Sequence, residues 1–169
     1  MKKILFIVGS LRAKSFNRQL ATMAKEIIGN RAEVSELDYS DLPLLNQDIE
    51  QPEPAAIARI RKAVAEADAI WIFTPEYNFS YPGHLKNLLD WLSRPVIPLD
   101  YGTPTCINGK RIAISGSGGK AATANCRENS RNYSPSSRPM CCRNRRVSPF
   151  LPKHGAPTFS PFPTSKKHN

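Results

Sequence analysis

The chain has 169 residues, 40% of them hydrophobic, and 24 Lys and Arg against 14 Asp and Glu give a formal net charge of +10 at pH 7. This length suits one domain with a sizeable core, and no apolar stretch approaches the roughly 20 residues that span a bilayer. Met1 to Lys3 are followed by an apolar run too short for a secretory signal, and four Cys outside a secreted context do not indicate a disulfide framework, so we expect a cytoplasmic protein.

Strand and helix patterns alternate over the first 120 residues. An apolar run at 4–8 is typical of a buried parallel strand, and Asn17 can cap a helix that Gly29 and Asn30 stop. The later elements expected are a strand at about 33–37, a helix opened by Pro52 and Pro54, a strand at 69–74, a helix ended by Pro95 and Pro98, and a weaker strand at 111–115. This alternation predicts an α/β fold with a parallel sheet and right-handed crossovers.

Helical spacing identifies the face of each helix that we expect to be buried. The apolar positions are Leu20, Met23, Ala24, Ile27 and Ile28 in the first helix, Ile57, Ile60, Val64 and Ala67 in the second, and Leu85, Leu88, Leu89 and Leu92 in the third.

The loop after the first strand, residues 9–18, has the polarity to hold a phosphate. Ser10 and Ser15 offer hydroxyls, Arg12 offers a fork of donors, and Asn17 can both cap the helix and donate outward. The loop contains neither the Gly-x-Gly-x-x-Gly of a dinucleotide fold nor the Gly-Lys-Ser/Thr of an NTP-binding loop. An ordinary capped turn between strand and helix would explain the same residues.

The loop after the third strand, residues 74–83, suits the edge of a flat ring. A rigid turn, a carboxylate, an aromatic and an amide follow one another at Pro75, Glu76, Tyr77 and Asn78. Taken singly, Tyr77 is also consistent with an aromatic at the rim of the core, and Glu76 with a solvated charge. Because strand-to-helix loops of open α/β sheets converge at the carboxyl edge, the two loops together point to FMN.

Taken together, these two motifs resemble those of the NAD(P)H-dependent FMN reductase family, flavodoxin-like proteins that include quinone, azo-dye and chromate reductases. The resemblance covers about residues 2–128 and rests on Gly-Ser-Leu-Arg-x-x-Ser-x-Asn-Arg from Gly9 and on Pro-Glu-Tyr-Asn-x-Ser-x-Pro-Gly-x-Leu-Lys-Asn-x-x-Asp-Trp from Pro75. It implies a parallel sheet of order 2-1-3-4, FMN with NADPH or NADH as reductant, and a homodimer or homotetramer with the flavin near an interface. The residues that it implies for FMN are Ser10, Arg12, Ser15 and Asn17 for the phosphate, Pro75, Glu76, Tyr77 and Asn78 for the ring, and Ser115, Gly116, Ser117, Gly118 and Gly119 in a third loop.

The resemblance implies hydride transfer from a nicotinamide to the flavin and onward to a quinone, azo, chromate or flavin acceptor. This chemistry needs no catalytic side chain, so we assign no acid or base role to Glu76, His84 or Asp90. We expect no metal site, because His84 is alone and Cys141, Cys142 and His154 lack paired metal-ligand spacing. The main alternative is a flavodoxin-like electron carrier, which shares the fold but does not oxidise a nicotinamide.

The segment 126–169 departs from the pattern. Residues 1–125 carry 15 basic and 13 acidic side chains (+2), whereas 126–169 carry nine basic side chains and one acidic (+8), together with seven of the 15 Pro. Such a composition predicts an irregular or disordered basic tail after a flavodoxin-like domain at 1–125 that lacks its fifth strand. A nucleic-acid-binding role for this charge is a weaker alternative, since the tail has few aromatics for base stacking.

A shift of reading frame would also produce such a tail. Read from the third base of the Asn129 codon, with UCN serines and CGN arginines, the shifted frame can encode Leu-Thr-Glu-Leu-Leu-Ser-Phe-Ile and then Val-Leu. This string has the pattern of a helix followed by the start of a strand, which the α/β alternation requires next. The argument against a frameshift is that UCN serines always give U-centred codons in this frame. Such codons encode apolar residues, so an apolar pattern would arise even in a tail that was never shifted.

Overall fold

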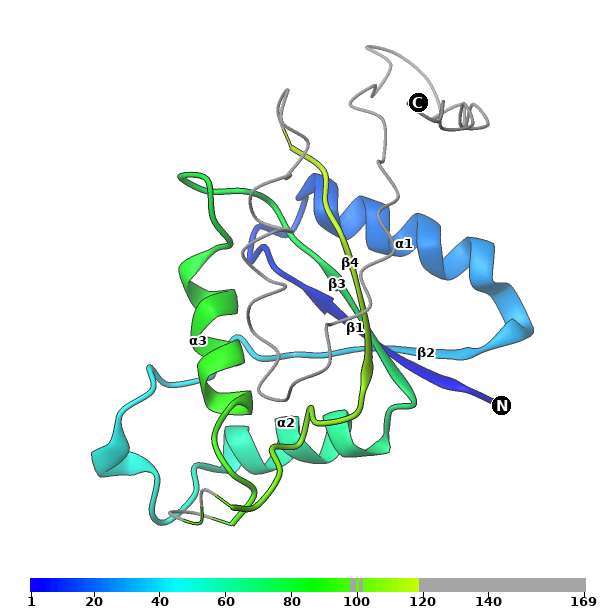
Figure 1. Ribbon diagram of the computed structural model, residues 1–169. Helices are drawn as coiled ribbons and strands as arrows, with labels where there is room; N and C mark the ends of the chain where they lie inside the picture. Colours follow the sequence, from blue (N-terminus) through cyan, green and yellow to red (C-terminus); the bar gives the residue numbers. More distant parts are fainter. Residues whose placement is uncertain (98–99, 101, 119–169) are drawn as a thin grey trace, which may run out of the picture.

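Four parallel strands form one sheet in the computed structural model, which describes residues 1–97, 100 and 102–118. The strands are β1 (Lys3–Val8), β2 (Glu33–Glu36), β3 (Ala69–Phe73) and β4 (Arg111–Ser115), in the spatial order β2-β1-β3-β4 (Figure 1). This confirms the predicted parallel sheet of order 2-1-3-4. The expected absence of a fifth strand, like the irregular tail, concerns residues outside the described ranges.

The strand limits agree with the apolar runs to within one residue. Leu37 donates its main-chain N–H to the Phe6 carbonyl at 2.8 Å, and Thr74 donates to the Ser115 carbonyl at 2.9 Å. The ladder therefore continues one residue beyond β2 and beyond β3, which is where the sequence pattern placed their ends.

Helices cover both faces of the sheet (Figure 1). Helix α1 (Phe16–Ile28) packs through Ala21 and Ala24 on one face, against the alternate β1 side chains Phe6 and Val8. Helices α2 (Ala55–Glu66) and α3 (Gly83–Leu92) pack on the other, and all the apolar side chains predicted for these two helices are buried: Ile57, Ile60, Val64, Ala67, Leu85, Leu88, Leu89 and Leu92. No helix of the described residues is long and apolar enough to cross a membrane.

Two expectations for α1 were wrong. Ser15, not Asn17, is the N-cap, with extended backbone and a hydroxyl that accepts a hydrogen bond from Arg18 N at 3.1 Å. Ile27 is 58% exposed, because α1 turns a narrower stripe toward the sheet than its apolar spacing implies. The predicted stop is confirmed: α1 ends at Ile28, and Gly29 follows with φ +52°, a conformation that favours glycine.

The 18-residue connection from β2 to α2 is fastened to α3. The Asn87 amide accepts from Leu45 N at 2.8 Å and donates to the Pro43 carbonyl at 2.8 Å, and Trp91 Nε1 donates to the same carbonyl at 2.9 Å. Arg94, just after α3, forms an ion pair with Glu50 at 2.6 Å. Two short 3₁₀ turns, η1 (Gly29–Arg31) and η2 (Gln47–Ile49), complete the described elements. The connection is thus held in place, although most of it has no regular structure.

Gly9, at the end of β1, lies where the first two loops come closest. A Cβ atom at this position would lie 2.8 Å from Thr74 Oγ1 and 2.9 Å from Leu85 Cδ2, distances that side-chain atoms do not tolerate. Its N–H donates to the Phe73 carbonyl at 2.7 Å. The absent side chain therefore lets the loop after β1 leave the sheet directly beside the end of β3.

Candidate functional site

The loops after β1, β3 and β4 meet at the carboxyl edge of the sheet, as the sequence predicted. Main-chain hydrogen bonds join the end of β1 to β3 at Gly9 and the end of β3 to β4 at Thr74. Asn17 then links the first loop to the third, at Ser117. The expected convergence of Ser10, Tyr77 and Gly116 at one edge is consistent with this arrangement, since they lie two, four and one residues beyond the ends of β1, β3 and β4.

In the first loop, the predicted phosphate residues have different surroundings. Ser10 is 97% buried, and within the described residues its hydroxyl forms no hydrogen bond. Arg12 is exposed, with its guanidinium carbon 5.6 Å from the centroid of the Phe16 ring, and no described residue accepts a hydrogen bond from it. Ser15 is buried and uses its hydroxyl to cap α1. Ser10 and Arg12 therefore retain side-chain donors for a ligand, whereas the Ser15 hydroxyl is engaged.

Asn17 is 2% exposed and is turned into the protein. Its Oδ1 accepts from Ser117 N at 2.9 Å, and its Nδ2 donates to the Ser117 carbonyl at 3.1 Å. Both ends of the side-chain amide thus bind the main chain of one residue that lies 100 positions away in the sequence. The spacing of the motif gives no sign of this contact.

The second loop is a tight reversal. Tyr77 N donates to the Ser80 carbonyl at 2.8 Å and Ser80 N donates to the Tyr77 carbonyl at 3.0 Å, while Asn78 and Phe79 have φ of +50° and +61°. Positive φ at both central residues is the pattern of a type I′ turn, for which Asn is well suited. The turn leaves Tyr77 and Phe79 exposed, whereas Pro75 and Glu76 are half-buried. Phe79, which the sequence reasoning did not select, adds a second aromatic ring to this rim.

The third loop follows β4. The Ser115 hydroxyl accepts from Trp71 Nε1 at 3.0 Å, so this side chain is engaged within the sheet. Gly116 is buried, Ser117 is half-buried and held by Asn17, and Gly118 is exposed. Gly119, the last residue predicted for the site, lies outside the described residues. This loop therefore offers a ligand mainly main-chain groups.

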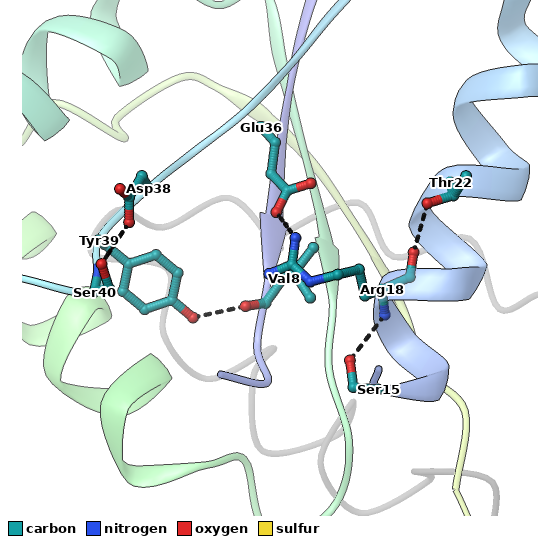
Figure 2. Close-up of polar contacts among 8 residues, drawn as sticks. All are labelled: Val8, Ser15, Arg18, Thr22, Glu36, Asp38, Tyr39 and Ser40. Atoms are coloured by element: carbon teal, nitrogen blue, oxygen red, sulfur yellow. Dashed lines mark hydrogen bonds and ion pairs between the residues drawn. The ribbon is translucent and has the colours of Figure 1, made fainter. Parts of the chain in front are cut away.

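A crevice of about 360 Å³ lies beside the first loop, between the ends of β1 and β2. Figure 2 shows the Tyr39 hydroxyl donating to the Val8 carbonyl, at 2.9 Å, and the ion pair of Arg18 in α1 with Glu36 in β2.

Burial raises the pKa of the Tyr39 phenol above its usual range, so it stays a donor at neutral pH. Hydrogen bonds from Ser40 lower the pKa of Asp38, which also lines the crevice. The carboxylates of Glu36 and Asp38 beside the single Arg18 would repel a phosphate from this crevice. The side of the first loop that carries Arg12 is therefore the better place for a phosphate.

Other polar groups near the site do not form a reactive cluster. His84, in the first turn of α3, stacks on Tyr39 with ring centroids 5.8 Å apart, and burial lowers the pKa of its imidazole. Lys86 and Asp90 form an ion pair along α3. Within the described residues no three His, Cys, Asp or Glu side chains are grouped as metal ligands would be. A larger hollow of about 590 Å³ lies around Asp68 and Lys110, at the opposite edge of the sheet from the three loops.

Comparisons of the sequence with known proteins identify relatives of this chain. The sequence profile described as NADPH-dependent FMN reductase matches residues 2–142, which extends beyond the motifs quoted above. A quinone reductase of Escherichia coli K12 is 39% identical over 118 residues, 68% of this chain and 62% of that protein. A 2-hydroxy-1,4-benzoquinone reductase of a Burkholderia species is 44% identical over 93 residues, 55% of this chain and 51% of that protein. The chain thus spans between half and two thirds of the length of these curated relatives.

A solved structure shares the overall fold. The flavoenzyme NAD(P)H:(acceptor) oxidoreductase FerB of Paracoccus denitrificans superposes with a TM-score of 0.75 at 29% identity, over 89% of this chain and 79% of its own. Sequence and structure comparisons therefore converge on the same group of proteins.

Proposed function

We propose that this chain, which belongs to the NADPH-dependent FMN reductase family, binds FMN at the carboxyl edge of its sheet and passes hydride from a nicotinamide dinucleotide to quinones or similar acceptors. The observation that carries the proposal is the meeting of the three loops that follow β1, β3 and β4, one bearing a free arginine fork and one bearing exposed aromatic rings. The curated relatives named as quinone reductases support the choice of acceptor.

The first loop would hold the phosphate. Among the residues predicted for the phosphate, the Ser10 hydroxyl and the Arg12 guanidinium are available side-chain donors, and the amino end of α1 adds main-chain N–H groups with favourable dipole orientation. Ser15 supports this end by capping the helix, which fixes where those N–H groups point.

The second and third loops would hold the ring. Main-chain groups of residues 75–78 and 116–118 can bond its polar edge, and Tyr77 and Phe79 can wall its apolar surface. FMN, when bound, supplies the redox chemistry itself, so the chain's part is to bind, orient and shield. Because hydride transfer through a bound flavin needs no acid or base from the protein, we assign no catalytic side chain.

Reduction by a nicotinamide tests this proposal directly. The full-length protein reconstituted with FMN is expected to lose its flavin absorbance within a catalytic turnover when mixed anaerobically with NADPH or NADH in a stopped-flow instrument, and to regain it on addition of a benzoquinone. An electron carrier of the same fold would bind FMN but leave the nicotinamide unoxidised. That result would retain the cofactor site and reject the reductase activity.

The proposal extends to assembly and location. Leu11, Phe16, Tyr77 and Phe79 expose apolar surface around the proposed cofactor site, and such a patch is typical of an interface. We therefore propose a homodimer or homotetramer in the cytoplasm, where the nicotinamide donor is available. Sedimentation of the FMN-loaded protein would measure the assembly.

We also propose that residues 1–125 form the FMN-binding domain and that 126–169 are a basic segment outside it. Removing residues 130–169 is then expected to leave the FMN dissociation constant within about twofold, because the proposed contacts all lie before residue 120. Titration of the apoprotein with FMN, followed by flavin fluorescence, would measure the constant. A large loss of affinity after this deletion would show that the tail is an authentic part of the site.

A further inference from the structure

Asn17 differs from the other polar residues of the first loop because its side chain is bonded to a distant loop. It is 2% exposed, and its amide forms two hydrogen bonds, of 2.9 and 3.1 Å, with the N–H and carbonyl of Ser117. This pairing uses the acceptor and a donor of the amide, and its reciprocal geometry matches that of two main chains paired in a sheet. Arg12, by contrast, is exposed and free to turn toward a ligand.

The contact joins the phosphate end of the proposed site to its third loop. Asn17 lies in the first turn of α1, which is fixed by the Ser15 cap, and Ser117 lies two residues beyond the end of β4. Within the described residues no other hydrogen bond is formed by the main chain of residues 116–118. Without the tether, that loop would have to be ordered when a ligand binds, and the cost would reduce the affinity for any ligand part that touches it.

We propose that Asn17 is a positioning residue that holds the loop after β4 in its ligand-binding conformation, and that it is not a ligand of the flavin phosphate. This inference rests on the proposed function, since it concerns the site that FMN would occupy. It separates the polar residues of the loop after β1 into those that meet the phosphate, Ser10 and Arg12, and those that shape the site, Ser15 and Asn17.

The test compares FMN with riboflavin, which has the ring but no phosphate. Titration of the apoprotein with each flavin, followed by fluorescence quenching, gives two dissociation constants for the wild type, Asn17→Ala and Thr22→Ala. Thr22 is a matched control because it is exposed on the same helix and bonds only the Arg18 carbonyl. Asn17→Ala is expected to weaken both flavins by the same factor, about tenfold, whereas Thr22→Ala leaves both unchanged.

A second measurement needs no ligand. In the apoprotein, hydrogen–deuterium exchange of the Ser117 amide is expected to be at least about tenfold faster in Asn17→Ala, because its acceptor is gone. Ser117→Pro removes the same hydrogen bond from the other side, so it serves if Asn17→Ala does not fold. It is expected to weaken FMN and riboflavin equally, and to add no further loss when the two changes are combined.

The outcomes separate the inference from the proposed function. Failure of the wild type to bind either flavin would overturn the proposed function. Binding by the wild type together with a loss confined to FMN in Asn17→Ala would overturn the positioning role, because it would make Asn17 a phosphate ligand. Unchanged exchange of the Ser117 amide in Asn17→Ala would also overturn it.

Discussion

Replacement of Trp91 by alanine is expected to lower the free energy of unfolding by about 3–5 kcal/mol. Trp91 is 1% exposed and is among the largest side chains fully buried in the described structure. Its Nε1 also donates to the Pro43 carbonyl at 2.9 Å, so the change removes both packing and an anchor of the connection between β2 and α2. Urea denaturation followed by circular dichroism would measure the loss.

Phenylalanine at position 91 separates the two contributions. It keeps most of the buried ring but has no donor, and the Pro43 carbonyl retains its hydrogen bond from Asn87. We therefore expect Trp91→Phe to cost about 1–2 kcal/mol, well below the alanine variant. Equal losses for the two variants would mean that the hydrogen bond, rather than the buried volume, dominates at this position.

This role of Trp91 gives a structural reason for part of the second motif. Asn87 and Trp91 belong to the string that carried the family resemblance, yet both bond the Pro43 region rather than the edge of the sheet. The anchored connection includes Tyr39, which in turn bonds the end of β1 through the Val8 carbonyl. A motif that identifies a cofactor family thus includes residues that support the fold around the site.

Elements set by local pattern were predictable from the sequence. The β4 limits at 111–115 agree with the structure, and the apolar stripes of α2 and α3 are buried as their spacing requires. In each of these elements the burial of one face or one run determines the structure, so a short window of sequence contains the necessary information.

Contacts between distant loops were not predictable in the same way. Ser15 and Asn17 are both good N-cap residues, and the choice between them depends on the backbone path out of β1. That path is constrained by the close approach of Gly9 to Thr74, and Asn17 is then available to bond Ser117, 100 residues later. Tyr39 was missed for a similar reason, because its partner lies on a strand that precedes it by some 30 residues.

Arg12 differs from its neighbours in the loop in ways that a binding measurement can detect. Its only described side-chain contact is with the face of the Phe16 ring, a weak interaction at an exposed site. The nearby Arg18 is held in an ion pair with Glu36, so it is less available to an anion. Lys14 is exposed in the same loop and provides a charge of the same sign for comparison.

Arg12→Ala is therefore expected to weaken FMN about 10- to 100-fold while leaving riboflavin nearly unchanged, because the lost interaction is a charge-assisted hydrogen bond to the phosphate alone. Fluorescence titration of the apoprotein with both flavins measures this ratio. Lys14→Ala is the matched control, with an expected change below about threefold, since its charge is solvated.

Arg12→Lys should recover only part of the loss, because a lysine retains the charge but lacks the planar fork. Repeating the titration at higher salt should reduce the effect of Lys14→Ala more than that of Arg12→Ala, as a direct contact is screened less than a distant charge. Equal weakening of FMN and riboflavin by Arg12→Ala would show that Arg12 does not bind the phosphate, and the phosphate contact would then have to be assigned to other residues of the loop.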